Sequence, residues 1–161
     1  LPISWMPNHE NLFLFLIGLF TIYLVLAGNR ALTFKKKLKA NKIDWLISGS
    51  MLLFSVIMIV IGLFGLLNKT SLSSLYLFFG AFGVFLTLAD FRFYKTLKKT
   101  KAGWLIAHIG RMMGALIASF TAFIVAGIGI GSLIAWILPT ILGTFYIIYW
   151  IKKVKVKTVK K

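Results

Sequence analysis

Long apolar runs alternate with short basic segments along the whole chain. Five runs of roughly 18–23 residues carry almost no charge, and they cover about 11–28, 45–67, 72–91, 104–126 and 133–151. An α-helix rises 1.5 Å per residue, so about 20 helical residues cross the hydrocarbon core of a bilayer. Strands of a membrane barrel would instead alternate apolar and polar positions. The pattern predicts an all-α bundle of five transmembrane helices, with residues 1–161 as a single domain.

The composition supports the same class of protein. Hydrophobic residues make up 60% of the chain and charged residues 14%, whereas an ordinary soluble domain has about 45–50% apolar and about 25% charged residues. A soluble domain of this size could not bury that much apolar surface. The net charge of +16 would suggest nucleic acid in a soluble protein, but the basic residues are confined to short segments between the apolar runs. We therefore expect the lipid bilayer, and no nucleic acid, as a partner.

The basic residues also predict the orientation in the membrane. Seventeen of the nineteen lie in 29–44, 92–103 and 152–161, whereas the alternate connections contain only Lys69. Cytoplasmic loops carry the excess of lysine and arginine, so the N-terminus is expected outside and the C-terminus in the cytoplasm. We expect the basic segments to bind anionic lipid headgroups. Trp45, Trp104 and Trp150 fall at the predicted cytoplasmic interface, where tryptophan is enriched.

Small residues recur every four positions in the fourth run. They form one stripe, which comprises Gly110, Gly114, Ala118 and Ala122. Such stripes let a neighbouring helix approach closely, so this helix is predicted to be central to the bundle. In the fifth run, Pro139 predicts a kink, with Gly143 one turn later. Between these two runs, the glycines at 127, 129 and 131 predict a tight outer turn.

A polar cluster is predicted on the cytoplasmic side of the membrane. His108 and Arg111 are three residues apart and therefore share a helix face. Asp90 is the acid that lies within an apolar run, and we predict an Asp90–Arg111 ion pair with His108 adjacent. The cluster is either a structural bridge between helices or a site for a proton, an anionic group or a cofactor. Arg30 is expected either to join this cluster or to face phospholipid headgroups.

No catalytic constellation is visible in the sequence. Cysteine is absent, and we find no carboxylate pair, no Ser–His–Asp candidate and no phosphate-binding loop. The chain is therefore interpreted as a non-enzymatic protein without a cofactor. A b-type haem with His108 as one axial ligand is the alternative. His9 precedes the first run, so the two histidines are separated by most of the bilayer and cannot hold one haem.

Several strings resemble an uncharacterised family of bacterial polytopic membrane proteins, known as a domain of unknown function. They are FLFLIGLFTIYLVLAGNRAL, LADFRF, WLIAHIGRMMGALIASFTAFIV and LPTILGTFYIIYWIKK, and the string His-x-x-Arg-Met-x-Gly-Ala at 108–115 is the most specific part. The resemblance covers nearly the whole chain and implies a location in the bacterial inner membrane. It also implies that this chain corresponds to the C-terminal five spans of a longer protein, with an upstream helical hairpin as a possible partner. No activity is implied.

The sequence leaves three functional hypotheses. In the favoured one, the polar cluster of Asp90, His108, Arg111 and Arg30 binds a small ligand or lipid, or supports assembly with other membrane subunits. The second is haem-based electron transfer through His108. The third is transport of a small molecule. Many transporters show internal repeats, and we find no convincing repeat between the two halves of this sequence.

Overall fold

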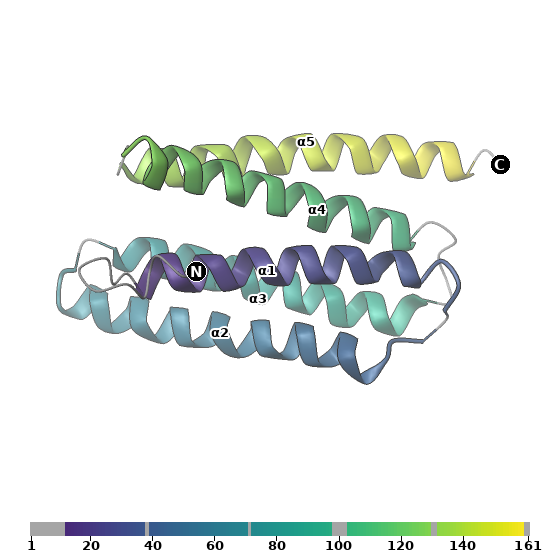
Figure 1. Cartoon of the computed structure of the whole chain (residues 1–161), viewed down its shortest axis with the longest axis horizontal. Coiled ribbons are helices and arrows are strands. Elements are labelled where there is room, and N and C mark those ends of the chain that lie inside the picture. Colours follow the sequence, from purple (N-terminus) through teal and green to yellow (C-terminus); the bar gives the residue numbers. More distant parts are fainter. Residues whose placement is uncertain (1–11, 38, 71, 98–102, 130–131, 160–161) are drawn as a thin grey trace.

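All regular secondary structure is helical over the residues that the structure describes. The computed structural model describes residues 12–37, 39–70, 72–97, 103–129 and 132–159. Its elements are α1 (Leu12–Thr33), α2 (Lys42–Leu67), α3 (Ser73–Thr96), α4 (Gly103–Ala122), a π-helical turn η3 (Phe123–Gly127) and α5 (Leu133–Val159) (Figure 1). All five α-helices are long and apolar enough to cross a membrane. The predicted bundle of five helices is confirmed.

Most helices extend beyond the predicted apolar runs. The largest extensions are at the basic ends, where α1 continues to Thr33, α3 to Thr96 and α5 to Val159. Lysine and arginine are good helix formers, so a change from apolar to basic residues ends the apolar run without ending the helix. The turn between α4 and α5 is explained by backbone conformation. Gly129 has a φ of +81°, a conformation that only glycine adopts readily, as the predicted turn requires.

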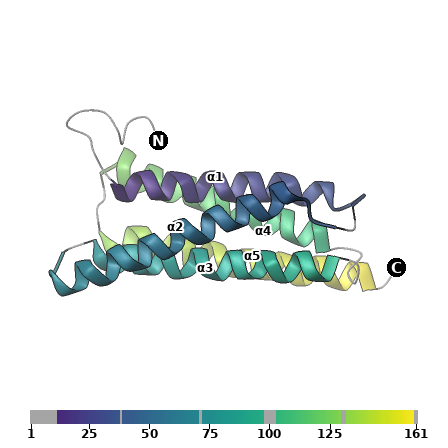
Figure 2. The same cartoon turned by 90° about the horizontal axis from the view of Figure 1, so that it is seen from below.

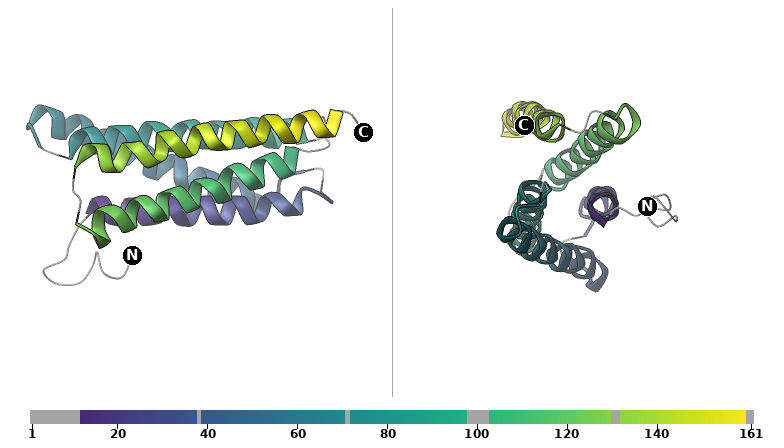
Figure 3. Two further views of the ribbon diagram at one scale, coloured as in Figure 1. Left: turned by 90° about the horizontal axis from the view of Figure 1, so that it is seen from above. Right: turned by 90° about the vertical axis from the view of Figure 1, so that its left-hand side faces the viewer.

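The helices form an open arrangement with α5 at its edge. In the end-on view, α5 lies beside α4, and α1 lies between α4 and the α2–α3 pair (Figure 3, right). The main packed pairs are α2 with α3, α1 with α4, and α4 with α5. Figures 1 and 2 show the α1–α2 connection, the start of α4 and the end of α5 at the same end of the molecule. The described parts of the basic segments that predict the orientation therefore share one end.

The interfacial tryptophans lie at this basic end. The ring of Trp45 stacks on Phe91 with a centroid separation of 5.2 Å. A lysine ammonium lies over each of the other two rings, Lys35 at 5.6 Å from the centroid of Trp104 and Lys153 at 4.8 Å from that of Trp150. A cation within about 6 Å of an aromatic centroid is attracted by the ring quadrupole. Aromatic and basic side chains thus stabilise each other at the same end of the bundle.

Glycines bring α2 and α3 into close contact. A Cβ added to Gly80 would lie 2.8 Å from Cγ1 of Ile59 and 3.0 Å from the main-chain oxygen of Ser55. A Cβ added to Gly62 would lie 2.7 Å from Cγ of Leu77. Small residues allow two membrane helices to approach in this way. The sequence predicted a close approach through the small residues of the fourth helix, and Gly62 and Gly80 make such an approach between the second and third helices.

The prediction that the fourth helix is central is wrong. In the apolar windows of α1 and α3, 39% of the residues are buried, against 11% in α4 and 6% in α5. The hydrophobic core of α1 and α3 includes the Phe13 ring, which meets Tyr76 and Trp136 at centroid separations of 5.0 Å each. Through Trp136, α5 is attached to this core near its N-terminal end. It continues as one helix through Pro139.

Candidate functional site

An ion pair between Asp90 of α3 and Arg111 of α4 lies inside the bundle, as the sequence predicts. Nη2 of Arg111 donates hydrogen bonds to Oδ1 of Asp90 and, at 3.1 Å, to the main-chain oxygen of Leu86. Leu86 and Asp90 are one helical turn apart on α3, so one guanidinium nitrogen reaches both. The side chains are only 11% and 5% exposed. A charge at this depth is costly unless it is paired, and each residue supplies the partner of the other.

The second carboxylate oxygen of Asp90 accepts two further hydrogen bonds. The Tyr23 hydroxyl of α1 donates to Oδ2 at 2.5 Å, and the Ser48 hydroxyl of α2 donates to it at 3.0 Å. Asp90 therefore connects its own helix to α1, α2 and α4. Hydrogen bonds to a charged acceptor are about twice as strong as neutral ones. The carboxylate is the main polar junction of the four helices.

A chain of hydroxyl groups extends from Asp90 toward the basic end. The Tyr94 hydroxyl lies 2.9 Å from Oγ of Ser48 and 3.4 Å from the main-chain oxygen of Asp44. Tyr23, Ser48 and Tyr94 were not predicted from the sequence. A usable signal was present for two of them, because Ser48 follows Asp44 by four residues and Tyr94 follows Asp90 by four. This spacing places each hydroxyl on the same helix face as the acid.

Arg30 has a partner that was not expected from the sequence. Its Nε donates to Oδ1 of Asp44, and Oδ2 of the same carboxylate accepts the main-chain N–H of Asn41 at 2.7 Å. Asp44 thus caps the N-terminus of α2 and neutralises Arg30 at once. The expectation that Arg30 joins Asp90 is therefore wrong, whereas the alternative that it faces phospholipid headgroups stays a prediction. A helix N-terminus favours an acid, and the short α1–α2 connection brings Arg30 to that acid.

His108 does not belong to the hydrogen-bonded cluster of Asp90. Its Nδ1 lies 2.8 Å from the main-chain oxygen of Gly28 in α1. At Gly28 the two helices are very close, because an added Cβ would lie 3.1 Å from Cβ of Arg111. This contact assigns His108 a role in joining α4 to α1. His108 is not among the residues that line the cavity described next, so that cavity does not fit a haem held by His108. His9, the other histidine, lies outside the described residues.

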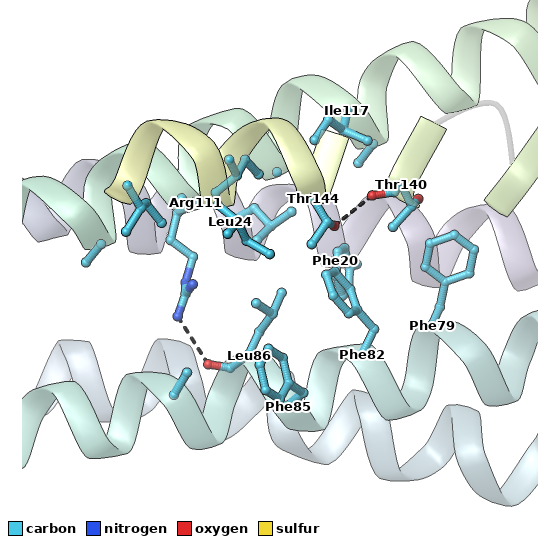
Figure 4. Close-up of a pocket in the computed structure, with 18 of the residues that line it drawn as sticks. Phe20, Leu24, Phe79, Phe82, Phe85, Leu86, Arg111, Ile117, Thr140 and Thr144 are labelled. Atoms are coloured by element: carbon cyan, nitrogen blue, oxygen red, sulfur yellow. Dashed lines mark hydrogen bonds between the residues drawn. The ribbon is translucent and has the colours of Figure 1, made fainter. Parts of the chain in front are cut away.

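An elongated apolar cavity adjoins the ion pair. It has a volume of about 510 Å³, lies between α1, α3, α4 and α5, and is partly open to the surroundings of the protein. Its walls are chiefly aromatic and aliphatic. Figure 4 shows the α3 side chains pointing toward those of α4 and α5 across the space. The principal lining residues are Phe20, Leu24, Phe79, Phe82, Phe85, Leu86, Phe93, Gly110, Arg111, Gly114, Ile117, Ala118, Trp136, Thr140 and Thr144.

The cavity runs parallel to the helices. Its α3 lining extends from Phe79 to Phe93, which corresponds to about 21 Å at a rise of 1.5 Å per residue. This is a large part of the roughly 30 Å hydrocarbon thickness of a bilayer. The cavity therefore has the length and the apolar lining of a site for an extended lipophilic molecule.

The small-residue stripe of α4 lines this cavity and does not serve as a helix-packing surface. Gly110, Gly114 and Ala118 all border the space. A Cβ added to Gly110 would meet no atom within 4 Å. A Cβ on Gly114 would only reach ordinary contact with Leu24, at 3.5 Å. The interpretation of the stripe as a close-packing face is wrong, because the missing side chains leave open space on this face.

Arg111 crosses the cavity from α4 toward α3. In Figure 4 its guanidinium lies near Leu86, with the aromatic rings of Phe20, Phe79 and Phe82 farther along the space. Its Nε is the one buried side-chain nitrogen or oxygen without a hydrogen-bond partner in the described part of the chain. An unsatisfied buried donor costs free energy. The site thus combines an apolar cavity, a compensated ion pair and one unused donor.

These features make the molecule a multi-pass helical membrane protein with a buried polar junction beside an apolar cavity. In comparisons with known proteins, no family model, no curated protein and no solved structure matches the chain. The predicted resemblance to a bacterial family is neither confirmed nor contradicted, and stays a prediction.

Proposed function

We propose that the protein is a non-enzymatic membrane protein that binds a lipophilic molecule in the cavity between α1, α3, α4 and α5. The observation that carries the proposal is the elongated apolar space of about 510 Å³ with Arg111 on its wall. Ligand sites are typically concave, about 300–1,000 Å³ in volume and mostly apolar, with a few polar groups that orient the ligand. The bilayer itself supplies molecules of this kind. The cavity gives such a molecule apolar contact along most of its length.

The glycines of α4 are central to this proposal, because they make the space. A cavity without an occupant lacks the dispersion contacts that a filled interior gains. Two glycines on neighbouring turns of one helix also carry a cost, since glycine disfavours helix by about 1 kcal/mol relative to alanine. Binding of a ligand gives these residues a purpose that helix packing does not.

Filling the cavity is expected to abolish binding while the fold is retained. Gly110→Phe places a ring in open space, so we expect affinity for methyl dibromostearate to fall at least about tenfold, or about 1.4 kcal/mol. Bromine quenches tryptophan fluorescence on contact, and Trp136 lines the cavity, so quenching in detergent solution measures the binding.

Gly49→Phe is the matched control. Gly49 also has no atom within 4 Å of an added Cβ, but it lies on α2 and does not line the cavity. We expect Gly49→Phe to bind like the wild type. Equal affinities of the wild type, Gly110→Phe and Gly49→Phe would show that the probe does not occupy this cavity, and the proposed function would be rejected.

We further propose that the basic end faces the cytoplasm, at anionic headgroups of a bacterial inner membrane. The positive-inside rule supports this orientation. The chain has no cysteine, so single cysteines report it cleanly. In intact cells we expect a membrane-impermeant thiol reagent to label Asn68→Cys and to leave Lys37→Cys unlabelled, with both labelled after permeabilisation. The opposite labelling pattern would reverse the orientation.

Haem-based electron transfer and transport of a small molecule are the other two hypotheses. No contact among the described residues favours either of them over the binding of a lipophile.

A further inference from the structure

The cavity is open on the side between α3 and α5. Phe85 of α3 and Ile148 of α5 both line it, yet these residues remain 64% and 45% exposed. The two helices are not among the main packed pairs, and Figure 4 shows Phe85 and Thr144 on opposite sides of the space. Both helices are long and apolar enough to cross a membrane. The opening therefore faces the hydrocarbon of the bilayer.

The cavity also reaches the basic end of the bundle. Its lining there includes Phe93 near the end of α3, Gly103 at the start of α4 and Ile151 on α5. On α5 the lining extends from Trp136 to Ile151, or about 22 Å at a rise of 1.5 Å per residue. Half of the hydrocarbon thickness is about 15 Å. An acyl chain that starts at the basic end and follows the cavity thus passes the middle of the bilayer.

Basic residues continue two of the lining helix faces at this end. Arg92 follows the lining residue Ala89 by three positions, and Lys152 follows the lining residue Ile148 by four. Residues at these spacings share a helix face. Both basic residues are exposed. The apolar walls formed by α3 and α5 therefore end in positive charge.

Positive charge is compensated in the interior and uncompensated at the end of the cavity. Asp44 and Asp90 are the two acids among the described residues. The first pairs with Arg30 and the second with Arg111, so neither acid is left to neutralise the basic residues that continue the walls. An anionic group is attracted to such residues near the membrane surface, and its burial beside an ion pair that is already neutral is costly.

We infer that the cavity holds one acyl chain of an anionic phospholipid, with the phosphate group of the lipid at Arg92 and Lys152. This inference rests on the proposed function and specifies its ligand class. The opening between α3 and α5 leaves room for the second acyl chain of the same lipid in the bilayer. The lipid enters sideways through this opening and does not have to leave the membrane.

Three lipids with the same dibrominated stearoyl chain test the headgroup. They are phosphatidylglycerol, phosphatidylcholine and the free fatty acid, each titrated into the full chain in neutral detergent at low salt and one mildly alkaline pH. Trp136 lines the cavity and is only 4% exposed, so the quenching that is lost in Trp136→Phe measures occupancy. We expect phosphatidylglycerol to bind at least about fivefold more tightly than phosphatidylcholine, the scale of one basic residue near an anionic headgroup. It is also expected to bind more tightly than the free acid, which lacks the second chain.

The position of the bromines tests the direction of the bound chain. Trp136 lies at the end of the α5 lining that is farthest from the basic end. We therefore expect phosphatidylglycerol with bromines near the methyl end of the chain to quench Trp136 more strongly than the same lipid with bromines near the ester. Stronger quenching by bromines near the ester would place the headgroup at the opposite end and overturn the inference.

Two double variants test the basic residues. Arg92→Gln with Lys152→Gln is expected to bring the affinity for phosphatidylglycerol to within about twofold of that for phosphatidylcholine, since both basic residues near the headgroup contribute to the preference. Lys36→Gln with Lys37→Gln removes the same charge at the same end, but these exposed residues follow α1. The last residue of α1 that lines the cavity is Leu24. We expect this control to keep the preference of the wild type.

The outcomes separate the inference from the proposed function. Equal affinity for phosphatidylglycerol and phosphatidylcholine, tighter binding of the free acid, or an equal loss of preference in the two double variants overturns the inference and leaves a lipophile-binding cavity intact. Absence of any quenching that depends on Trp136, with every lipid, overturns both. A preference for phosphatidylglycerol that is lost only in the Arg92 and Lys152 double variant supports the inference.

Discussion

Replacing Asp90 by alanine is expected to lower the free energy of unfolding by about 3–5 kcal/mol. Removal of one partner of a buried ion pair leaves the other charge unpaired, and losses of this size are usual in that situation. Here the charge left behind is Arg111, whose side chain is only 11% exposed. The hydroxyls of Tyr23 and Ser48 also lose their acceptor. Unfolding with sodium dodecyl sulfate in mixed micelles, followed by circular dichroism, measures the change.

Asp44→Ala is the comparison for Asp90→Ala. It removes a carboxylate from the second ion pair, whose arginine, Arg30, is 24% exposed. Its main loss is the hydrogen bond to the N–H of Asn41 at the start of α2, and loss of a helix cap costs about 0.5–2 kcal/mol. Asp90→Ala is therefore expected to be the more damaging variant. Equal destabilisation by the two variants would contradict the interpretation that the Asp90 carboxylate is the main polar junction of the four helices.

A double-mutant cycle distinguishes pairing from the other contacts of Asp90. We expect the double variant Asp90→Leu with Arg111→Met to be less destabilised than the sum of the single variants, because the double variant leaves no unpaired charge. Replacing both partners of a buried pair by apolar residues is often neutral. Additive effects would indicate that Asp90 and Arg111 do not interact energetically.

Gly80→Ala is expected to destabilise the protein by about 1–3 kcal/mol, the usual cost of overpacking a tight interior. The new methyl group would lie 3.0 Å from the main-chain oxygen of Ser55 and 3.1 Å from the main-chain nitrogen of Ile59. These atoms belong to the α2 backbone and cannot rotate away as a side chain does. The α2–α3 pair would have to separate. Thermal unfolding in detergent measures the loss.

Two alanine variants serve as controls for Gly80→Ala. Gly49 has no atom within 4 Å of an added Cβ, and Gly114 has only the Leu24 methyl groups at 3.5 and 3.6 Å. We expect Gly49→Ala and Gly114→Ala to be neutral or slightly stabilising, because alanine favours helix over glycine. A loss at either control equal to that of Gly80→Ala would show that the close α2–α3 contact is not its cause.

The candidate site could be predicted in part. Asp90 and Arg111 are conspicuous because charges are rare inside apolar runs, and a rare acid and a rare base at similar depth are natural partners. Asp44 is less conspicuous because it lies at the edge of a run, where an acid has many possible partners. Tyr23, Ser48 and Tyr94 are ordinary residues of a membrane helix until a neighbouring helix brings a carboxylate to them.

The glycines show a second limit of prediction from sequence. The repeat at Gly110 and Gly114 has the spacing of a packing face, and the spacing is the same whether a helix or a cavity lies opposite. Gly80 carries no such repeat, yet it contacts the α2 backbone. A stripe of small residues identifies a smooth face. It does not identify what occupies the space next to that face.

The order of residues was sufficient to specify the number and approximate position of the five membrane helices, and the pairing of Asp90 with Arg111. These follow from local quantities, namely the length of apolar runs and the cost of a lone charge in an apolar medium. The three-dimensional arrangement was needed to show which helices pack together, that α5 lies at the edge, and that the α4 glycines line a cavity. Side-chain packing among apolar surfaces sets these features, and one apolar helix face resembles another when only the order of residues is known.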